Sequence, residues 1–261
     1  YKKGKIIIFI INDVLFDKTA QKIAQKYQAK TDYLRWSLKS IFLIFLLQNE
    51  NYDAVFYCDN DLYFCDDFSF LMDDLKNYAV LLTPHYYCFN PEKKQIWLEA
   101  NFRSGLYNAG FIGVNKNAIS VLSWWAKCCL YRCERKYTHG LFDDQKYLDL
   151  VPIIEPTTKV LQHQGCNVAY WNTDICKRLK VNDKILINGK YLIVFIHFAN
   201  LTMRHILEEK DTLLMPYFEK YAAVLQKYKP DFFAEKVARK RSRREGLFKM
   251  KWYFLEYWRK K

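Results

Sequence analysis

Short apolar runs alternate with segments of helical periodicity over the first half of this chain. Residues 5–11, 54–57 and 79–82 are rich in β-branched and aromatic side chains, which is typical of strands buried on both faces. Apolar residues at helical spacing lie around these runs, at 19–27, 33–48 and 70–76. This order predicts an α/β fold in which helices cover a sheet and site residues gather at the carboxyl ends of its strands.

The rest of the chain continues the pattern. Residues 91–103 are polar and predict a loop, and 107–114 predict a further strand. A long helix follows around Trp124, and a short one at 142–150 is expected to stop near the next proline. Two apolar runs, 185–187 and 191–198, are separated by Asn-Gly-Lys and predict a β-hairpin.

The composition narrows the class of protein. The 261 residues are 51% hydrophobic and can bury a full core, but the longest apolar runs are far shorter than the roughly 20 residues that cross a bilayer. Eight cysteines without a CxxC pair predict reduced thiols in a cytosolic setting. Cys128, Cys129 and Cys133 lack a fourth ligand at zinc spacing, so we interpret them as buried thiols. Because the sequence opens on Tyr1 rather than Met, we expect further chain upstream.

An acidic triplet, Asp59-Asn60-Asp61, directly follows the predicted strand at 54–57. Two carboxylates at positions i and i+2 can turn toward one ion, and hard oxygen ligands suit Mg²⁺ or Mn²⁺. Such ions usually complete their shell with substrate phosphates. The pattern therefore indicates a metal site for a phosphorylated substrate, with an acidic pair on a solvated turn as the alternative.

Four segments resemble, in order and spacing, those of bacterial GT-A nucleotide-diphospho-sugar transferases related to the glycogenin and lipopolysaccharide galactosyltransferase group. Residues 55–64 resemble the Y-L-D-A-D-x-Y-F segment of that group, 107–111 its N-S/A-G strand, 142–148 its D-Q helix start and 195–198 its H-F-x-G segment. A Cys and an Asn replace the usual Leu and Ala of the first segment, and Ala199 precedes an Asn where the group often has a Gly. The resemblance implies a mixed α/β sheet with flanking helices.

The resemblance also implies metal ligands and donor contacts. Asp59, Asp61 and His197 would hold Mn²⁺ or Mg²⁺, and a neutral imidazole is a suitable ligand for such an ion. Four residues would contact a nucleotide-sugar donor: Lys39, Asn60, Asn108 and Gly110. The structural alternatives are a core histidine, a solvated helix face that carries Lys39 and Arg35, and a small-residue strand packed under a helix.

Catalytic roles are implied for Asp144 and Gln145, beside the sugar and opposite the leaving diphosphate. The group retains the anomeric configuration of the sugar. Because Gln145 is an amide, a front-face route in which the leaving diphosphate takes the acceptor proton is favoured over a carboxylate nucleophile. As the alternative, Asp144 would be an ordinary acid at a helix N-terminus.

Residues 162–172 resemble the H-P-G-x-N-x-A-x-W-N stretch of the same bacterial subgroup, with Gln164 in place of the proline. Aromatic rings stack on the apolar faces of sugars, and side-chain amides bind hydroxyl groups. The resemblance therefore implies that four residues bind the sugar or the acceptor: His163, Asn167, Trp171 and Asn172.

The implied reaction moves a sugar, most simply from a UDP-hexose, to a surface glycan of capsule or lipopolysaccharide. One alternative is a non-catalytic module that binds glycan or nucleic acid through a basic tail. Another is a phosphoryl or nucleotidyl transferase that uses the same acidic pair. Neither a Gly-rich Walker loop nor an RNA-module signature occurs in the sequence, so we expect no nucleic-acid partner.

The C-terminal residues 236–261 contain 11 Lys/Arg and two Asp/Glu, which is +9 of the total net charge of +13. Interfacial aromatic residues such as Trp252 and Trp258 are interspersed with these cations. We therefore expect a catalytic domain at 1–205 and a helical region at 206–261 that holds it on the cytoplasmic face of an anionic membrane, near a lipid-linked acceptor. The alternative is a C-terminal helix that packs on the body.

Overall fold

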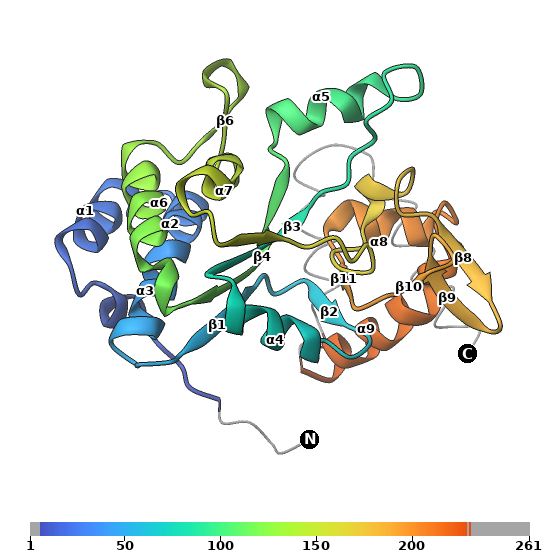
Figure 1. Cartoon of the computed structure of the whole chain (residues 1–261), viewed down its shortest axis with the longest axis horizontal. Coiled ribbons are helices and arrows are strands. Elements are labelled where there is room, and N and C mark those ends of the chain that lie inside the picture. Colours follow the sequence, from blue (N-terminus) through green and yellow to red (C-terminus); the bar gives the residue numbers. More distant parts are fainter. Residues whose placement is uncertain (1–5, 229, 231–261) are drawn as a thin grey trace.

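A four-stranded sheet in the order β1–β4–β3–β7 forms the centre of the structure, a computed structural model that describes residues 6–228 and 230 (Figure 1). The strands are β1 (Ala54–Cys58), β3 (Val80–Pro84), β4 (Tyr107–Asn115) and β7 (Thr158–Val160). β4 runs antiparallel to both β1 and β3, whereas β3 and β7 are parallel. The mixed α/β sheet with flanking helices that the sequence predicts is confirmed.

Helices cover both faces of this sheet because its side chains alternate. Val80 and Leu82 of β3 join the large apolar cluster on one face, and Leu81 joins the cluster on the other. The first face is covered by α1 (Lys18–Tyr27), α2 (Thr31–Ser37), α3 (Lys39–Gln48) and α6 (Ile119–Tyr131), and the second by α4 (Ser69–Asn77). The single helix predicted over 33–48 is thus two helices, which meet at Leu38.

The strand predicted at 5–11 is wrong for the described part of that segment. Residues 6–10 form no regular element, and a 3₁₀ turn, η1 (Ile11–Val14), follows. Ile6 and Ile8 are 89% and 83% exposed. An apolar run supplies the side chains of a strand, but a strand also needs a hydrogen-bonding neighbour, and within the described residues β1 pairs with β4 alone.

The loop predicted at 91–103 is also wrong, because α5 (Gln95–Arg103) occupies most of it. Trp97 and Ala100 stand three positions apart on this helix and pack into a small apolar cluster with Tyr87 and Trp171. Because the residues around Trp97 and Ala100 are mostly polar, the sequence pattern did not indicate a helix here. Their contact puts α5 beside the end of β3.

The short helix predicted at 142–150 is present as the 3₁₀ helix η4 (Gln145–Leu150), but it continues into α7 (Val151–Ile154) instead of stopping near the proline. Three short elements precede it: β5 (Arg135–Lys136), η3 (Tyr137–His139) and β6 (Leu141–Phe142). Pro152 lies in the first turn of α7, where its missing N–H breaks no helical hydrogen bond. β5 and β6 form a hairpin that projects beyond the sheet on the same side as α5 (Figure 1).

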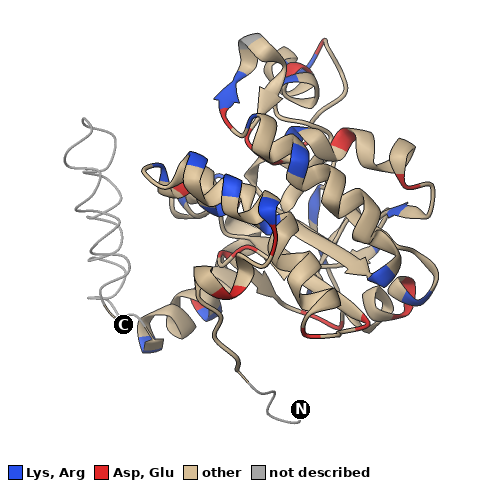
Figure 2. Ribbon diagram, turned by 90° about the vertical axis from the view of Figure 1, so that its left-hand side faces the viewer, with Lys and Arg blue, Asp and Glu red and all other residues tan. Residues whose placement is uncertain are grey.

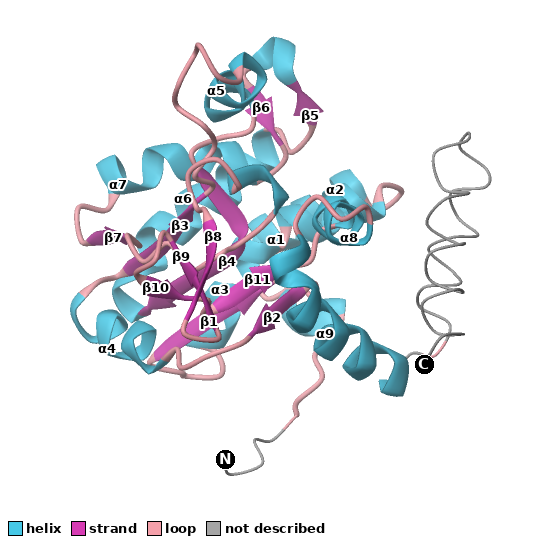
Figure 3. Cartoon of the chain, turned by 90° about the vertical axis from the view of Figure 1, so that its right-hand side faces the viewer, coloured by secondary structure: helices cyan, strands magenta, loops and turns pink. Residues whose placement is uncertain are grey.

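A second apolar cluster forms around the last third of the described chain. β2 (Leu62–Phe64) pairs with β11 (Phe195–His197). The predicted hairpin is confirmed for β9 (Lys184–Ile187) and β10 (Tyr191–Leu192), with β8 (Arg178–Val181) added at its edge. Its second strand, predicted over 191–198, ends at Leu192, because β11 pairs with β2 and not with β9. The remaining helical elements are η2 (Lys116–Ala118), η5 (Tyr170–Asn172), α8 (Asn200–Leu207), η6 (Thr212–Leu214) and α9 (Met215–Tyr228). Phe198 stacks on Tyr221 with ring centroids 4.4 Å apart, so α9 packs against the segment that carries β11 (Figure 3).

The basic segment predicted at 236–261 lies outside the described residues. Acidic and basic residues are interspersed over the face of the described part drawn in Figure 2. None of the helices in 6–228 is long and apolar enough to cross a membrane. All eight cysteines, which lie within that range, have free thiols.

Candidate functional site

A bulge in β4 leaves backbone groups of this strand available to side chains of the site. A register shift in the β3–β4 pairing leaves residues 109–111 opposite no residue of β3. Such bulges redirect side chains and free backbone groups from the ladder. The Ala109 amide donates to Gln145 Oε1 at 3.2 Å, and its carbonyl accepts from Lys39 Nζ at 3.0 Å.

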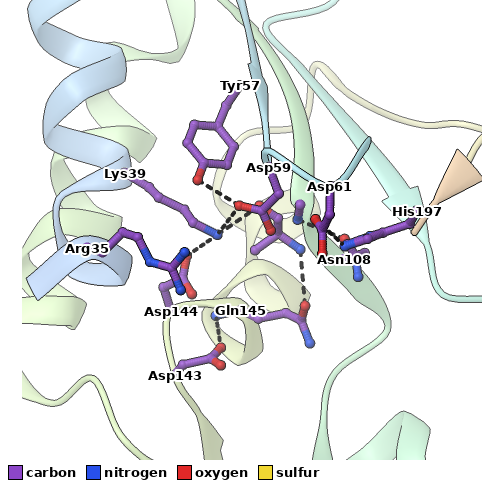
Figure 4. Close-up of polar contacts among 12 residues, drawn as sticks. Arg35, Lys39, Tyr57, Asp59, Asp61, Asn108, Asp143, Asp144, Gln145 and His197 are labelled. Carbon is purple, nitrogen blue, oxygen red and sulfur yellow. Dashed lines mark hydrogen bonds and ion pairs between the residues drawn. The ribbon is translucent and has the colours of Figure 1, made fainter. Parts of the chain in front are cut away.

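Asp59, Asp61 and His197 converge at the carboxyl end of β1 (Figure 4). The Leu62 amide donates to the Asp59 carbonyl at 3.1 Å, which closes a tight turn between the two carboxylates. β2 follows this turn, and its pairing with β11 sets His197 opposite Leu62. His197 Nε2 lies 3.1 Å from Asp61 Oδ1, and the three residues offer ligand atoms within 4.8 Å of one another. Two carboxylates and an imidazole suit Mn²⁺ or Mg²⁺, so the residues present fit the predicted ion.

Asn167 and Asn172 hold the imidazole of His197 from behind. Asn167 Oδ1 lies 3.3 Å from His197 Nδ1, which as the N–H donor leaves the lone pair of Nε2 for a metal. Asn172 Nδ2 donates to the Asn167 carbonyl at 2.9 Å. Both amides are 0% exposed, so the prediction that they contact a sugar is corrected to a supporting role beneath the metal ligands.

Gly110 leaves no room for a side chain. A Cβ atom at this position would lie 2.6 Å from Asn108 Oδ1, 2.7 Å from His197 Cε1 and 3.1 Å from Asp59 Oδ2. Real Cβ atoms essentially never come within 3.0 Å of such atoms. The side chains of Asn108, His197 and Asp59 therefore close over the bare backbone of Gly110, and the contact of this glycine with a donor sugar stays a prediction.

Lys39 is a buried cation between the two acidic groups of the site. It is 5% exposed, and its Nζ lies 3.3 Å from Asp144 Oδ2 and 3.7 Å from Asp59 Oδ1. Burial alone would lower the pKa of Lys39, but the charges of Asp144 and Asp59 outweigh it and raise that pKa. Tyr57 completes the group, since its hydroxyl donates to Asp59 Oδ1 at 2.8 Å. Lys39 is not on a solvated helix face, which excludes the alternative left open by the sequence.

Gln145 braces the backbone around the site. Besides accepting from Ala109, its side chain donates to the Ser104 carbonyl at 2.8 Å, so its amide ties β4 to the end of α5. Asp144 is 1% exposed, and burial raises the pKa of its carboxyl to about 7 against the opposing effect of Lys39. Neither side chain has the freedom of an exposed nucleophile.

His85 belongs to the site but was not predicted. Its Nδ1 donates to the Gly105 carbonyl at 3.0 Å, which leaves Nε2 to accept from Asn108 Nδ2 at 3.1 Å. Burial lowers the pKa of His85 to about 3, so the ring is neutral. The fixed tautomer orients the Asn108 amide, whose Oδ1 accepts from the Gly110 amide at 2.7 Å. The available signal was its place directly after a buried strand and a proline.

One cavity of about 430 Å³ collects most of the predicted residues. Its walls include ten of them: Lys39, Asp59, Asn60, Asp61, Asn108, Gly110, Asp144, Gln145, Trp171 and His197. The structure does not bring His163 there. That ring packs against Phe70 and Tyr191, with centroids 5.3 and 4.8 Å away, because the loop that carries it turns toward the β9–β10 hairpin.

No family model matches the chain. Two uncharacterized proteins of Bacillus subtilis (strain 168) are similar to it in sequence. YfnF is 29% identical over 184 residues, which are 67% of this chain and 59% of YfnF. YfnD is 26% identical over 203 residues, which are 75% of this chain and 62% of YfnD. The chain thus spans about three fifths of the length of these curated relatives.

Among solved structures, mouse xyloside xylosyltransferase 1 in its apo form superimposes on 76% of this chain with a TM-score of 0.44. The two sequences are 13% identical, and 76% of the mouse chain is covered. This similarity is too low to assign an activity.

Proposed function

We propose that this protein is a metal-dependent glycosyltransferase of the GT-A type that uses a nucleoside-diphosphate sugar. The observation that carries the proposal is the convergence of Asp59, Asp61 and His197 in a cavity that Lys39 also enters. Asp59, Asp61 and His197 would hold a divalent cation there, and the cation would stabilise the negative charge that grows on the leaving diphosphate.

The charges of the cavity support an anionic substrate bound together with a metal. Its walls carry four carboxylates, Asp59, Asp61, Asp143 and Asp144, and three cations, Arg35, Lys39 and Arg135. Without an ion these carboxylates would repel a diphosphate. A divalent cation on Asp59 and Asp61 would change the net formal charge of the cavity walls from negative to positive. The cavity would then attract a diphosphate.

An apolar cavity of about 340 Å³ adjoins this site and supports a nucleotide as the donor. Arg35 and Lys39 line both cavities, and Tyr57 lines the apolar one. The walls of the smaller one are otherwise mostly apolar: Phe9, Ile10, Ile11, Val14, Leu34, Leu38 and Phe42. We propose that the base and ribose of the donor lie in the apolar cavity, so that the diphosphate passes Arg35 and Lys39 on its way to the metal ligands.

The residues near the transferred sugar favour retention of configuration without a covalent intermediate. Gln145 is an amide held by two backbone groups, and Asp144 is buried against Lys39. Neither is placed as a free nucleophile. We propose a front-face route in which an oxygen of the leaving diphosphate accepts the proton of the acceptor hydroxyl. The finer assignments, a UDP-hexose as donor and a capsule or lipopolysaccharide glycan as acceptor, belong to the same proposal.

The cavity disfavours the non-catalytic nucleic-acid-binding alternative. Nucleic-acid sites are lined by cations that neutralise phosphates, whereas four carboxylates line this one. The basic residues 236–261, on which that alternative depends, lie outside the described part.

Release of free nucleotide from a panel of UDP-, GDP- and dTDP-sugars in the presence of Mn²⁺ tests the function. We expect one donor to be hydrolysed slowly without acceptor, and EDTA to stop its hydrolysis. If Mn²⁺ binds at the site but no donor in the panel releases its nucleotide, the protein is not an enzyme that uses sugar nucleotides.

A further inference from the structure

The far side of the large cavity, away from α2 and α3, is built from aromatic side chains. They come from four separate segments: the end of β3, α5, the β5–β6 hairpin and η5. In Figure 1, α5 and the β5–β6 hairpin rise on two sides of the carboxyl end of β3. The metal ligands therefore have a nucleotide-sized apolar cavity on one side and an aromatic wall on the other.

One part of this wall is a row of three nearly parallel rings. His85 stacks on Tyr87 with centroids 4.6 Å apart, and Tyr87 stacks on Trp97 at 5.4 Å. His85 and Tyr87 are buried, whereas Trp97 is only half-buried. The edge of the Tyr170 ring meets Trp97 at 5.7 Å and 65°. Trp97 is thus a rigidly supported indole at the cavity wall.

The β5–β6 hairpin supplies the facing part. Arg135 lies over the Trp36 ring at 4.4 Å and over the Phe142 ring at 4.9 Å, and its Nε donates to Asp143 at 2.8 Å. Tyr137 stacks on Phe142 at 5.6 Å and 15° and remains 52% exposed. The hairpin therefore presents an anchored, partly exposed phenol to the cavity.

Polar groups accompany these rings. Tyr87, Tyr137 and Tyr170 all line the cavity, and each carries a hydroxyl group. Burial raises the pKa of the Tyr87 hydroxyl, so that group stays protonated. The indole N–H of Trp171 is buried and has no hydrogen-bond acceptor among the described residues. Aromatic faces combined with hydroxyl and N–H groups suit a sugar ring, which has apolar C–H faces and a polar rim.

We propose that Trp97, with Tyr137 and Tyr170, forms an acceptor subsite in which the indole stacks on a pyranose ring and so selects a sugar acceptor. The inference rests on the proposed function, because the donor then occupies the cavity beside α2 and α3 and leaves this side to the acceptor. A lipid chain would not use the tyrosine hydroxyls, and a second nucleotide would meet no further metal site among the described residues. The acceptor is therefore a glycan whose reactive ring, or the ring next to it, has an unobstructed apolar face.

The test compares Trp97→Ala and Trp97→Phe in the full chain. Methyl β-D-glucopyranoside and methyl β-D-galactopyranoside serve as probes of the subsite, and UDP with Mn²⁺ serves as the probe of the donor side, with binding followed by ligand-observed NMR. Loss of an aromatic stacking partner weakens binding roughly three- to tenfold. We expect that loss for the pyranosides with Trp97→Ala, a smaller one with Trp97→Phe, and a lesser effect on UDP in both.

Phe102→Ala is the matched control, because Phe102 is a 70% exposed aromatic residue of the same helix that does not line the cavity. It should leave the binding of both probes unchanged. If Trp97→Ala fails to fold, Tyr137→Ala provides the second variant, since that ring is half exposed.

The outcomes separate the subsite from the overall function. Pyranoside binding that is absent in the wild-type protein, unaffected by both substitutions, or weakened no more than UDP binding overturns the subsite. Pyranoside binding that depends on Trp97 in a protein that releases nucleotide from no donor supports the subsite and rejects the transferase.

Discussion

Gly110→Ala should damage the metal site while leaving the fold in place. The added Cβ would need roughly 0.7–0.8 Å of movement from Asn108 Oδ1 and His197 Cε1 to reach ordinary contact at about 3.4 Å. That movement is several times the roughly 0.2 Å within which metal–ligand distances are held. Substitutions that disturb the support of metal ligands lower metal affinity by about 10- to 100-fold, and we expect a loss of that size for Mn²⁺.

Gly113→Ala is the matched control for this experiment. Gly113 lies on the same strand, and its Cβ would come within 2.9 Å of the Phe56 ring and 3.2 Å of Leu81, far from any metal ligand. Both variants overpack the structure, which costs about 1–3 kcal/mol of unfolding free energy. The thermal midpoint should therefore fall in both, whereas only Gly110→Ala should lose Mn²⁺ affinity.

Calorimetric titration of Mn²⁺ into the purified full chain, together with thermal unfolding followed by circular dichroism, gives both quantities. Two results would contradict this role of Gly110. One is wild-type Mn²⁺ affinity in a folded Gly110→Ala protein. The other is an equal loss of affinity in Gly113→Ala, which would show that any strain in β4 disturbs the site.

Four further predictions concern other parts of the chain. Asp61→Ala should abolish nucleotide release, as EDTA should, because the ion loses a carboxylate; full activity after both treatments would reject the metal assignment. Gln145→Ala should slow turnover without eliminating it, and intact-mass analysis should find no glycosyl adduct; a trapped adduct would reject the front-face route. Because burial raises the pKa of Asp144 from 3.8 to about 7, its contribution to the free energy of unfolding is complete below pH 4 and is lost as the pH rises to about 7. Asp144→Asn should flatten stability over that interval in chemical denaturation, and an unchanged slope would contradict the assignment. Full-length protein should co-sediment with anionic liposomes at low salt, and a version ending at Glu235 should not; equal behaviour of the two would reject residues 236–261 as a membrane anchor.

The three candidate metal ligands could be selected from the sequence because each lies at the end of an apolar run. Asp59 and Asp61 lie directly after β1, and His197 ends β11. Local pattern is sufficient here because the first polar residues after an apolar run mark the end of a strand, even though β1 is an edge strand that is only partly buried. That the three side chains meet was implied by the resemblance and not by spacing, because the β2–β11 pairing joins residues more than 130 positions apart.

The parts that could not be predicted depend on contacts between distant segments. Asn167 and Asn172 were predicted to bind sugar, but both are buried. Asn167 contacts His197, and Asn172 donates a hydrogen bond to Asn167. Trp97 lies in a stretch too polar to predict a helix, and the buried face of that helix comes from its contacts with distant aromatic residues such as Tyr87 and Trp171. The prediction of a strand at 5–11 was wrong for a related reason, because hydrophobicity does not specify a hydrogen-bonding neighbour.

The bulge in β4 links these observations. A regular β3–β4 pairing would hold the Ala109 amide and carbonyl in the ladder, and neither Lys39 nor Gln145 could bond to them. Because the bulge releases both groups, one side of β4 accepts the buried lysine from α3, and the other is tied through Gln145 to the end of α5. The backbone of residues 109–111 thus positions two parts of the site. It holds the Lys39 cation beside the proposed diphosphate site, and through Gln145 it holds the end of the helix that carries Trp97. In the proposed enzyme, the donor and acceptor sides are therefore fixed to one strand, and the metal ligands close over it at Gly110, where the two sides meet.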